Sequence, residues 1–100
     1  MVKRVVWSAN ALSDRIQILS FWYSRTGTKT YSRKLDQKLK SAINYLKRHP
    51  EIGRKLENRD ERFLVRDHYQ LFYVLKESEI HIVHIWDCRR NPDDLILDQY

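Results

Sequence analysis

The sequence predicts an α+β domain in which an N-terminal strand and an antiparallel helix hairpin precede a three-stranded antiparallel meander. Apolar residues recur every three or four positions through most of the first half, and they alternate with period two in the second half. The gaps between the three strand-like segments are too short for a crossover, so those strands must be antiparallel. A chain of 100 residues has the common size of one domain, and we expect residues 1–100 to form a single one.

The first half predicts one strand and two helices. Residues 3–7 are rich in β-branched side chains and predict a short strand near a sheet edge. Ser8 is typical of a helix N-cap, and Gly27 ends the first helix. The second helix ends at His49, because Pro50 disfavours helical geometry in the residue before it. The stripe expected to pack from the first helix is Leu12, Ile16, Leu19 and Tyr23, widened by Phe21 and Trp22. The stripe of the second is Tyr31, Leu35, Leu39, Ala42, Ile43 and Leu46.

The second half predicts a polar surface connection followed by the meander. The connection is 51–60, and the strands are 61–66, 69–76 and 80–87. Two-residue turns would place Arg66 opposite Tyr69 and Tyr73 opposite Ile82.

That register sorts the strand residues into two faces. One face carries Arg62, Leu64, Arg66, Tyr69, Leu71, Tyr73, Ile82, His84 and Trp86. The other carries Phe63, Val65, Gln70, Phe72, Val74, His81, Val83 and Ile85. Both are apolar, and helices can cover only one of them. We therefore expect the other face to be exposed or covered by a partner.

Composition limits the class of protein. The net charge is +6, and residues 1–50 hold eleven Lys and Arg against two acids, which suits nucleic acid or an acidic protein partner. No apolar run is long enough for a membrane helix or a signal peptide, and the single Cys88 fits a reducing compartment, so we expect a cytoplasmic protein. The four histidines lack metal-ligand spacing and glycines are scarce, so we expect no metal and no cofactor.

Four arginines are the strongest candidates for a site. Arg62 and Arg66 share a strand face, and Arg89 and Arg90 follow the last strand. Guanidinium groups bind phosphate in bidentate fashion and stabilise the charge of a phosphoryl-transfer transition state. The alternative is that these arginines form ion pairs with the neighbouring acids Glu61, Asp67 and Asp87. The sequence leaves both interpretations open.

Four segments together resemble the RelE/ParE superfamily of bacterial type II toxins. They read HPEIGR at 49–54, RFLV at 62–65, YQLFY at 69–73 and IWDCRRNP at 85–92. The resemblance implies a growth-inhibiting toxin that a cognate antitoxin neutralises. Members of the superfamily are either ribosome-dependent endoribonucleases, which cut messenger RNA without a metal, or inhibitors of DNA gyrase. The two kinds share one fold, so individual residues must distinguish them.

The ribonuclease pattern is incomplete in this chain. Gln70 stands where ribonuclease members carry an arginine, and Asp87 stands where many relatives have a histidine. The preceding strand offers Arg62 and Arg66 instead of lysines or a glutamate. By the same resemblance the face of Gln70 borders the cleft, while Tyr69, Leu71 and Tyr73 pack on the helices.

These comparisons favour a toxin of the ParE-like, gyrase-inhibiting kind. The alternatives are a RelE-like, metal-independent endoribonuclease acting on ribosome-bound messenger RNA, and a non-toxic remnant that retains only antitoxin binding. The residues that carry over as catalytic candidates are Arg89 and Arg90. The candidates for target binding are Arg62, Arg66 and Gln70. The expected partners are the antitoxin and either the ribosome-bound message or gyrase.

Overall fold

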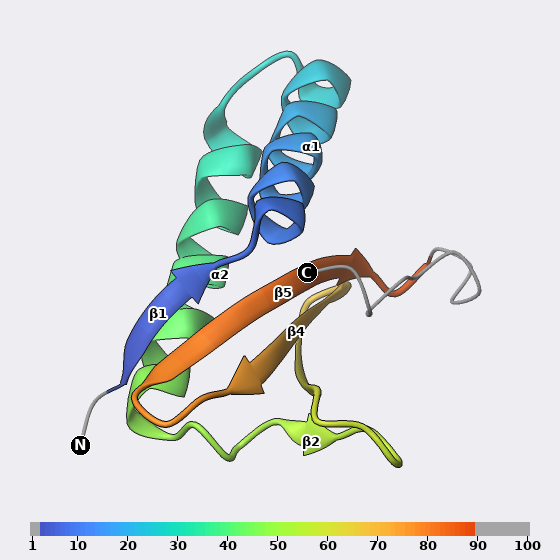
Figure 1. The fold of residues 1–100 in the computed structure, drawn as a ribbon. Coiled ribbons are helices and arrows are strands. Elements are labelled where there is room, and N and C mark those ends of the chain that lie inside the picture. The colour runs from blue at the N-terminus through green and yellow to red at the C-terminus, as the bar shows by residue number, and fades with distance from the viewer. Residues whose placement is uncertain (1–2, 90–100) are drawn as a thin grey trace.

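The computed structural model describes residues 3–89 and confirms the predicted fold class. Its elements are β1 (Arg4–Trp7), α1 (Ala9–Thr26), α2 (Thr30–Arg48), β2 (Arg54–Lys55), β3 (Arg62–Arg66), β4 (Tyr69–Leu75) and β5 (Glu79–Asp87). The strands form one sheet in the order β1-β5-β4-β3-β2, with β1 parallel to β5 and the other pairs antiparallel (Figure 1). The short strand β2 lies within the segment expected to be an irregular connection. Within residues 3–89, no helix is long and apolar enough to cross a membrane.

The predicted boundaries of the first helix and the predicted end of the second helix are confirmed. The Ser8 hydroxyl oxygen accepts a hydrogen bond from the Ala11 N–H at 3.0 Å, which satisfies one backbone donor of the first turn of α1. Gly27 ends α1 with φ 74°, a left-handed conformation that glycine adopts without strain. Helix α2 ends at Arg48, immediately before His49 and Pro50.

The face by which α1 packs differs from the predicted stripe. Its core contacts come from Ala11, Ile18, Leu19 and Trp22. Leu12, Ile16 and Tyr23 are exposed instead, by 44%, 64% and 46%. Apolar side chains surround most of the circumference of α1, so helical spacing alone did not select the packed side. In α2 the predicted stripe is buried except for Tyr31, which is 40% exposed.

The sheet confirms the predicted register and adds one irregularity. Arg66 pairs with Tyr69, and Tyr73 pairs with Ile82. The next pair joins Phe72 to His84, so Val83 is an extra residue that forms a β-bulge. Beyond the bulge the two faces of β5 exchange. This corrects the predicted faces: Ile85 lies in the core under the helices with Tyr69, Leu71 and Tyr73, whereas Trp86 lies on the opposite side.

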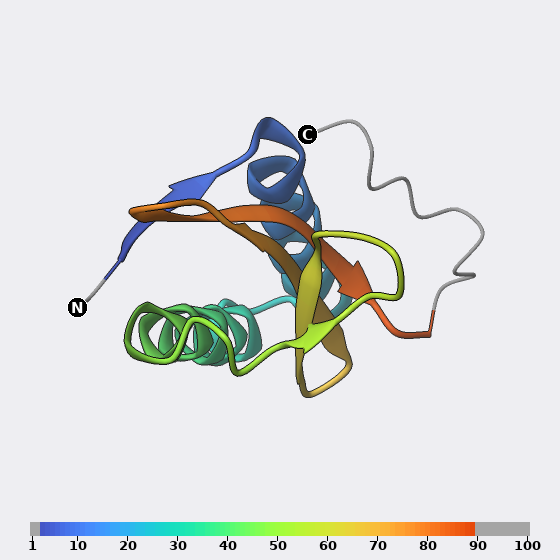
Figure 2. The ribbon, with the colours of Figure 1, turned by 60° about the horizontal axis from the view of Figure 1, so that its bottom comes forward.

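The second face of the sheet is buried, contrary to the expectation of an exposed apolar surface. Phe72, Val74, Val83 and Trp86 form a second cluster in which no side chain is more than 6% exposed. Leu56 and Phe63 pack against it. The sheet twists strongly (Figure 2), and the segment around β2 contributes Leu56 to this cluster. The connection that precedes β3 is exposed along most of its length, as predicted, and Leu56 is the residue by which it packs against the sheet.

Candidate functional site

A cleft of about 470 Å³ lies between α1 and the end of β5 that carries Arg89. It forms there because β1 pairs with only the first part of β5, from Glu79 to Ile82. Farther along, α1 takes the place of a strand: the Asp14 carboxylate accepts a hydrogen bond from the Ile85 N–H at 3.0 Å. The lining combines the apolar Phe21, Trp22 and Ile85 with the charged Arg25, Asp87 and Arg89.

The Asp14 carboxylate also binds the side chain of the residue before Ile85. His84 Nδ1 lies 2.9 Å from the same oxygen that accepts from the Ile85 N–H. A proton on Nδ1 satisfies this contact and leaves Nε2, which is buried without a partner among the described residues, as an acceptor. One carboxylate thus fixes both α1 and the rim of the cleft.

An aromatic wall closes one side of the cleft. Trp22 donates a hydrogen bond from Nε1 to the Tyr69 hydroxyl at 2.8 Å, and Phe21 packs edge-on against Trp22 with 5.1 Å between ring centroids. Burial raises the pKa of Tyr69, so its hydroxyl stays neutral at physiological pH. The wall is therefore apolar and rigid, with Phe21 left 53% exposed at its edge.

Arg89 lines the cleft. It also forms an ion pair with Asp87, the alternative role that the sequence left open. Its Nε and Nη2 donate to the two carboxylate oxygens of Asp87 at 2.9 and 2.8 Å. These bonds lower the pKa of Asp87 and raise that of Arg89, so both groups remain charged. The guanidinium lies 5.9 Å from the Trp22 ring centroid, and its side chain stays half exposed. Arg89 is thus held in a fixed orientation with donors left over for a partner.

Arg90, the second catalytic candidate, lies outside the described residues. The candidates Arg62, Arg66 and Gln70 lie inside them but are not brought together. Arg62 donates from Nη1 to the carbonyl oxygens of Glu51 and Gly53 at 3.3 and 3.0 Å, which anchors the segment before β2.

Arg66 and Gln70 occupy opposite faces of the sheet. Arg66 donates to the Val65 carbonyl at 2.8 Å and lines a groove against α2, next to the ion pair of Lys38 with Asp67. Gln70 pairs with Trp86 on the face away from the helices, as the family resemblance implied, but it does not line the cleft, which takes Tyr69 from the other face. Arg89 is therefore the one predicted site residue, among those described, that lines the cleft between α1 and β5.

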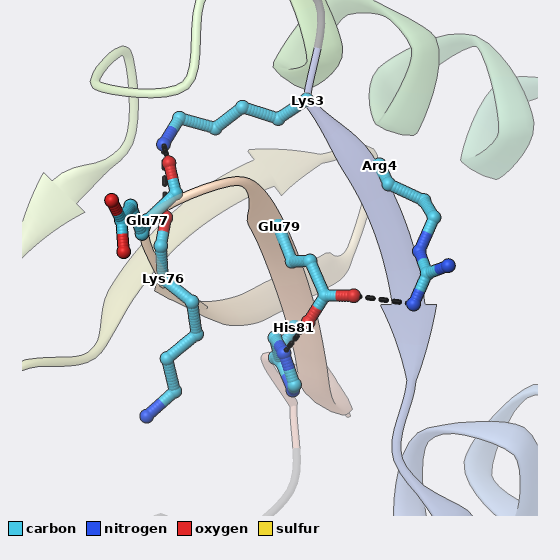
Figure 3. Close-up of polar contacts among 6 residues, drawn as sticks. All are labelled: Lys3, Arg4, Lys76, Glu77, Glu79 and His81. Atoms are coloured by element: carbon cyan, nitrogen blue, oxygen red, sulfur yellow. Dashed lines mark hydrogen bonds and ion pairs between the residues drawn. The ribbon is translucent and has the colours of Figure 1, made fainter.

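A second polar cluster joins β1 to the start of β5 (Figure 3). Glu79 binds both Arg4 and His81, with 2.9 Å between His81 Nε2 and the carboxylate. The hydrogen bond from His81, followed by that from Arg4, lowers the pKa of Glu79. Lys3 donates from Nζ to two carbonyl oxygens of the β4–β5 turn at 2.9 and 3.0 Å. The cluster fixes the parallel strand pair, and within residues 3–89 no group of three His, Cys, Asp or Glu could hold a metal ion.

Comparison with known proteins identifies the family. The family model described as ParE toxin of type II toxin-antitoxin system, parDE, matches residues 5–92. The chain belongs to this ParE toxin family. It is accordingly the toxin component of a type II toxin–antitoxin system, a class defined by pairing with a protein antitoxin. No curated protein sequence matches the chain significantly.

A solved structure shares the fold of this ParE-family chain. It is a chain of the chromosomal ParDE TA system from P. aeruginosa, which superimposes with a TM-score of 0.73. The match covers 86% of this chain and 96% of that chain at 21% sequence identity. Identity that low supports the fold and leaves the site to be argued from the residues themselves.

Sequence reasoning missed most of the cleft of this ParE-family chain. The apolar wall involves Trp22 and Tyr69, which are far apart in sequence and were assigned to packing alone. The exposed position of Phe21 was hidden because the apolar stripe of α1 was placed on the wrong side. The available signal was Arg89, since an arginine directly after the last strand must lie at the sheet's end.

Proposed function

We propose that this ParE-family toxin arrests growth by inhibiting DNA gyrase in the cytoplasm, and that a cognate antitoxin neutralises it. The observation that carries the proposal is the match of the ParE family model over residues 5–92. The departures from the ribonuclease pattern point the same way.

The chemistry of the cleft favours a protein target over RNA cleavage. Cleavage without a metal needs a general base and acid placed on the ribose hydroxyl and the leaving oxygen. No histidine is among the described residues that line the cleft, and its Tyr69 hydroxyl accepts from Trp22. Gln70, which replaces the ribonuclease arginine, lies on another face. The two carboxylates of the cleft are already engaged, Asp14 with His84 and Asp87 with Arg89.

The same cleft has the composition of a protein-binding site. Tryptophan, tyrosine and arginine dominate the binding energy of protein interfaces, and an exposed aromatic beside a fixed arginine is a common anchor. Phe21, Trp22 and Arg89 supply this set in adjacent positions. We therefore assign the contact with gyrase to this cleft, with Arg89 as the target-binding residue.

Inducible expression tests the proposal. The toxin alone is expected to stop growth with messenger RNA left intact, and the purified protein is expected to inhibit gyrase supercoiling. Co-expression with the protein encoded by an adjacent gene should restore growth. Cleaved messages on ribosomes with normal supercoiling would instead identify the ribonuclease alternative, and growth that continues unaffected would identify the non-toxic remnant.

Arg89→Ala tests the site. It removes a half-exposed guanidinium whose contacts are Asp87 and the outer face of the Trp22 ring, so we expect loss of gyrase inhibition from a folded protein. Arg54→Ala, at an exposed arginine of β2 outside the cleft, is the matched control and should remain fully inhibitory. Inhibition that survives Arg89→Ala, and survives the double variant at 89 and 90, would contradict the assignment.

A further inference from the structure

A shallow groove of about 450 Å³ runs between α1 and α2, close to the turn that joins them. The turn lies at the end of the helix hairpin that points away from the strands (Figure 1). The groove residues that could contact an anion are Ser20, Tyr23, Ser24, Lys29 and Arg33. The Asp36 carboxylate also borders the groove, but it is already bonded to Arg15 at 2.8 Å and to Lys40 at 3.4 Å.

The cations at this end of the hairpin lack acidic partners. The sequence contains no Asp or Glu between Asp14 and Asp36. Within residues 3–89, the cations that form no ion pair in this stretch are Arg25, Lys29, Arg33 and Lys34. Six cations elsewhere among residues 3–89 do form ion pairs, namely Arg4, Arg15, Lys38, Lys40, Arg59 and Arg89. The positive charge of the hairpin end is therefore available to an external anion.

Folding stability does not account for the positive charges at the start of α2. Lys29 and Arg33 flank the first turn of α2, where the helix dipole is positive and favours acidic side chains. That turn contains no acid, and Lys29 makes no side-chain cap. Lys29 instead lies over the Tyr23 ring, 6.0 Å from its centroid, with its ammonium group exposed at the groove. The charges therefore oppose helix formation slightly, which favours a role in binding.

We propose that the groove between α1 and α2 binds the phosphate backbone of duplex DNA. Lys29 and Arg33 would neutralise phosphates, and the hydroxyls of Ser20, Tyr23 and Ser24 would donate hydrogen bonds to phosphate oxygens. Cations with serine and tyrosine hydroxyls are the donors that proteins use for backbone contacts without sequence reading. The choice of duplex DNA rests on the proposed gyrase target, because gyrase acts on duplex DNA. The groove is separate from the cleft that contains Arg89.

The test measures binding of the full-length toxin to a fluorescent 20-base-pair duplex by anisotropy, over a range of salt concentrations. The variant Lys29→Gln/Arg33→Gln removes one lysine and one arginine from the groove. Arg54→Gln/Lys55→Gln is the matched control, since it removes the same two residue types from exposed positions on β2. Each lost phosphate contact lowers the slope of log affinity against log salt by about 0.9. The groove variant should therefore lose about 1.8 in slope and, at 0.1 M salt, on the order of 60-fold in affinity.

The control should lose little affinity, and circular dichroism should show both variants folded. Equal losses in the two variants would mean diffuse attraction to net charge and would overturn the proposal, as would absence of DNA binding by the wild type. Tighter binding to single-stranded RNA of equal length than to the duplex would overturn the choice of DNA. A toxin that inhibits gyrase without binding DNA refutes this inference alone, and one that binds DNA through the groove without inhibiting gyrase refutes only the proposed function.

Discussion

The hydroxyl of Tyr73 offers a sharp test of how the segment between α2 and β3 is held. Tyr73 is fully buried in β4, and its hydroxyl accepts a hydrogen bond from the Gly53 N–H at 2.8 Å and donates one to the Pro50 carbonyl at 2.9 Å. Burial is the main cause that raises the pKa of Tyr73, so the hydroxyl keeps its proton for the second bond. Two backbone groups of the connection thus depend on one side chain.

Tyr73→Phe removes the hydroxyl and retains the packing of the ring. A buried donor left without a partner costs about 1–3 kcal/mol, and Gly53 is buried. We therefore expect Tyr73→Phe to lower the free energy of unfolding by about 2 kcal/mol, or the melting temperature by roughly 10 °C for a domain of this size. Chemical denaturation at pH 7, followed by circular dichroism, measures the change.

Tyr45→Phe is the matched control. Tyr45 is 43% exposed on α2, and its variant should stay within about 0.5 kcal/mol of the wild type. Gly53→Ala provides an independent check. A Cβ at that position would overlap the hydroxyl and ring of Tyr73, so this variant should also lower the free energy of unfolding. If Tyr73→Phe unfolds with the same free energy as Tyr45→Phe, the hydroxyl does not anchor the segment and the reasoning is wrong.

Three further predictions concern the helices and the cleft. Asp36 binds Arg15 through both carboxylate oxygens, and this lowers its pKa below 3.8, so the pair stabilises the fold above that pH and ceases to do so as the pH falls through the folded-state pKa. Asp36→Asn should thus cost roughly 1 kcal/mol at pH 7 and progressively less as the pH falls below 3.8 in urea unfolding; a cost independent of pH would contradict it. Asp14→Ala should expose the Ile85 N–H and speed its hydrogen exchange at least tenfold, whereas unchanged protection would show that the Asp14 carboxylate does not protect this edge. Arg89→Ala should abolish growth arrest while retaining antitoxin binding in a pull-down assay, and loss of both would indicate a folding defect.

The fold was predictable because its signals are local. The cap at Ser8, the stop before Pro50 and the two-residue turn at Asp67 each depend on a few neighbouring residues. Asp67 adopts a φ of 55°, a left-handed conformation that aspartate tolerates better than most residues, and the turn fixes the register of β3 with β4.

The parts that were not predictable depend on residues far apart in the chain. The bulge at Val83 exchanges the faces of β5, and nothing in the spacing of its residues marks it. The parallel pairing of β1 with β5 joins Arg4 to Glu79, which brings together two ends of the domain. Neither the helical nor the strand periodicity of the sequence indicates the cleft. It exists where β5 extends beyond β1 and α1 covers the remaining edge.

The central claim is that this ParE-family toxin acts on gyrase and not on messenger RNA. Its most direct test combines two assays on the purified protein: gyrase supercoiling of a relaxed plasmid, and cleavage of a message on stalled ribosomes. We predict that the toxin inhibits supercoiling, that Arg89→Ala removes the inhibition, and that the message stays intact. Normal supercoiling together with cut message would contradict the account.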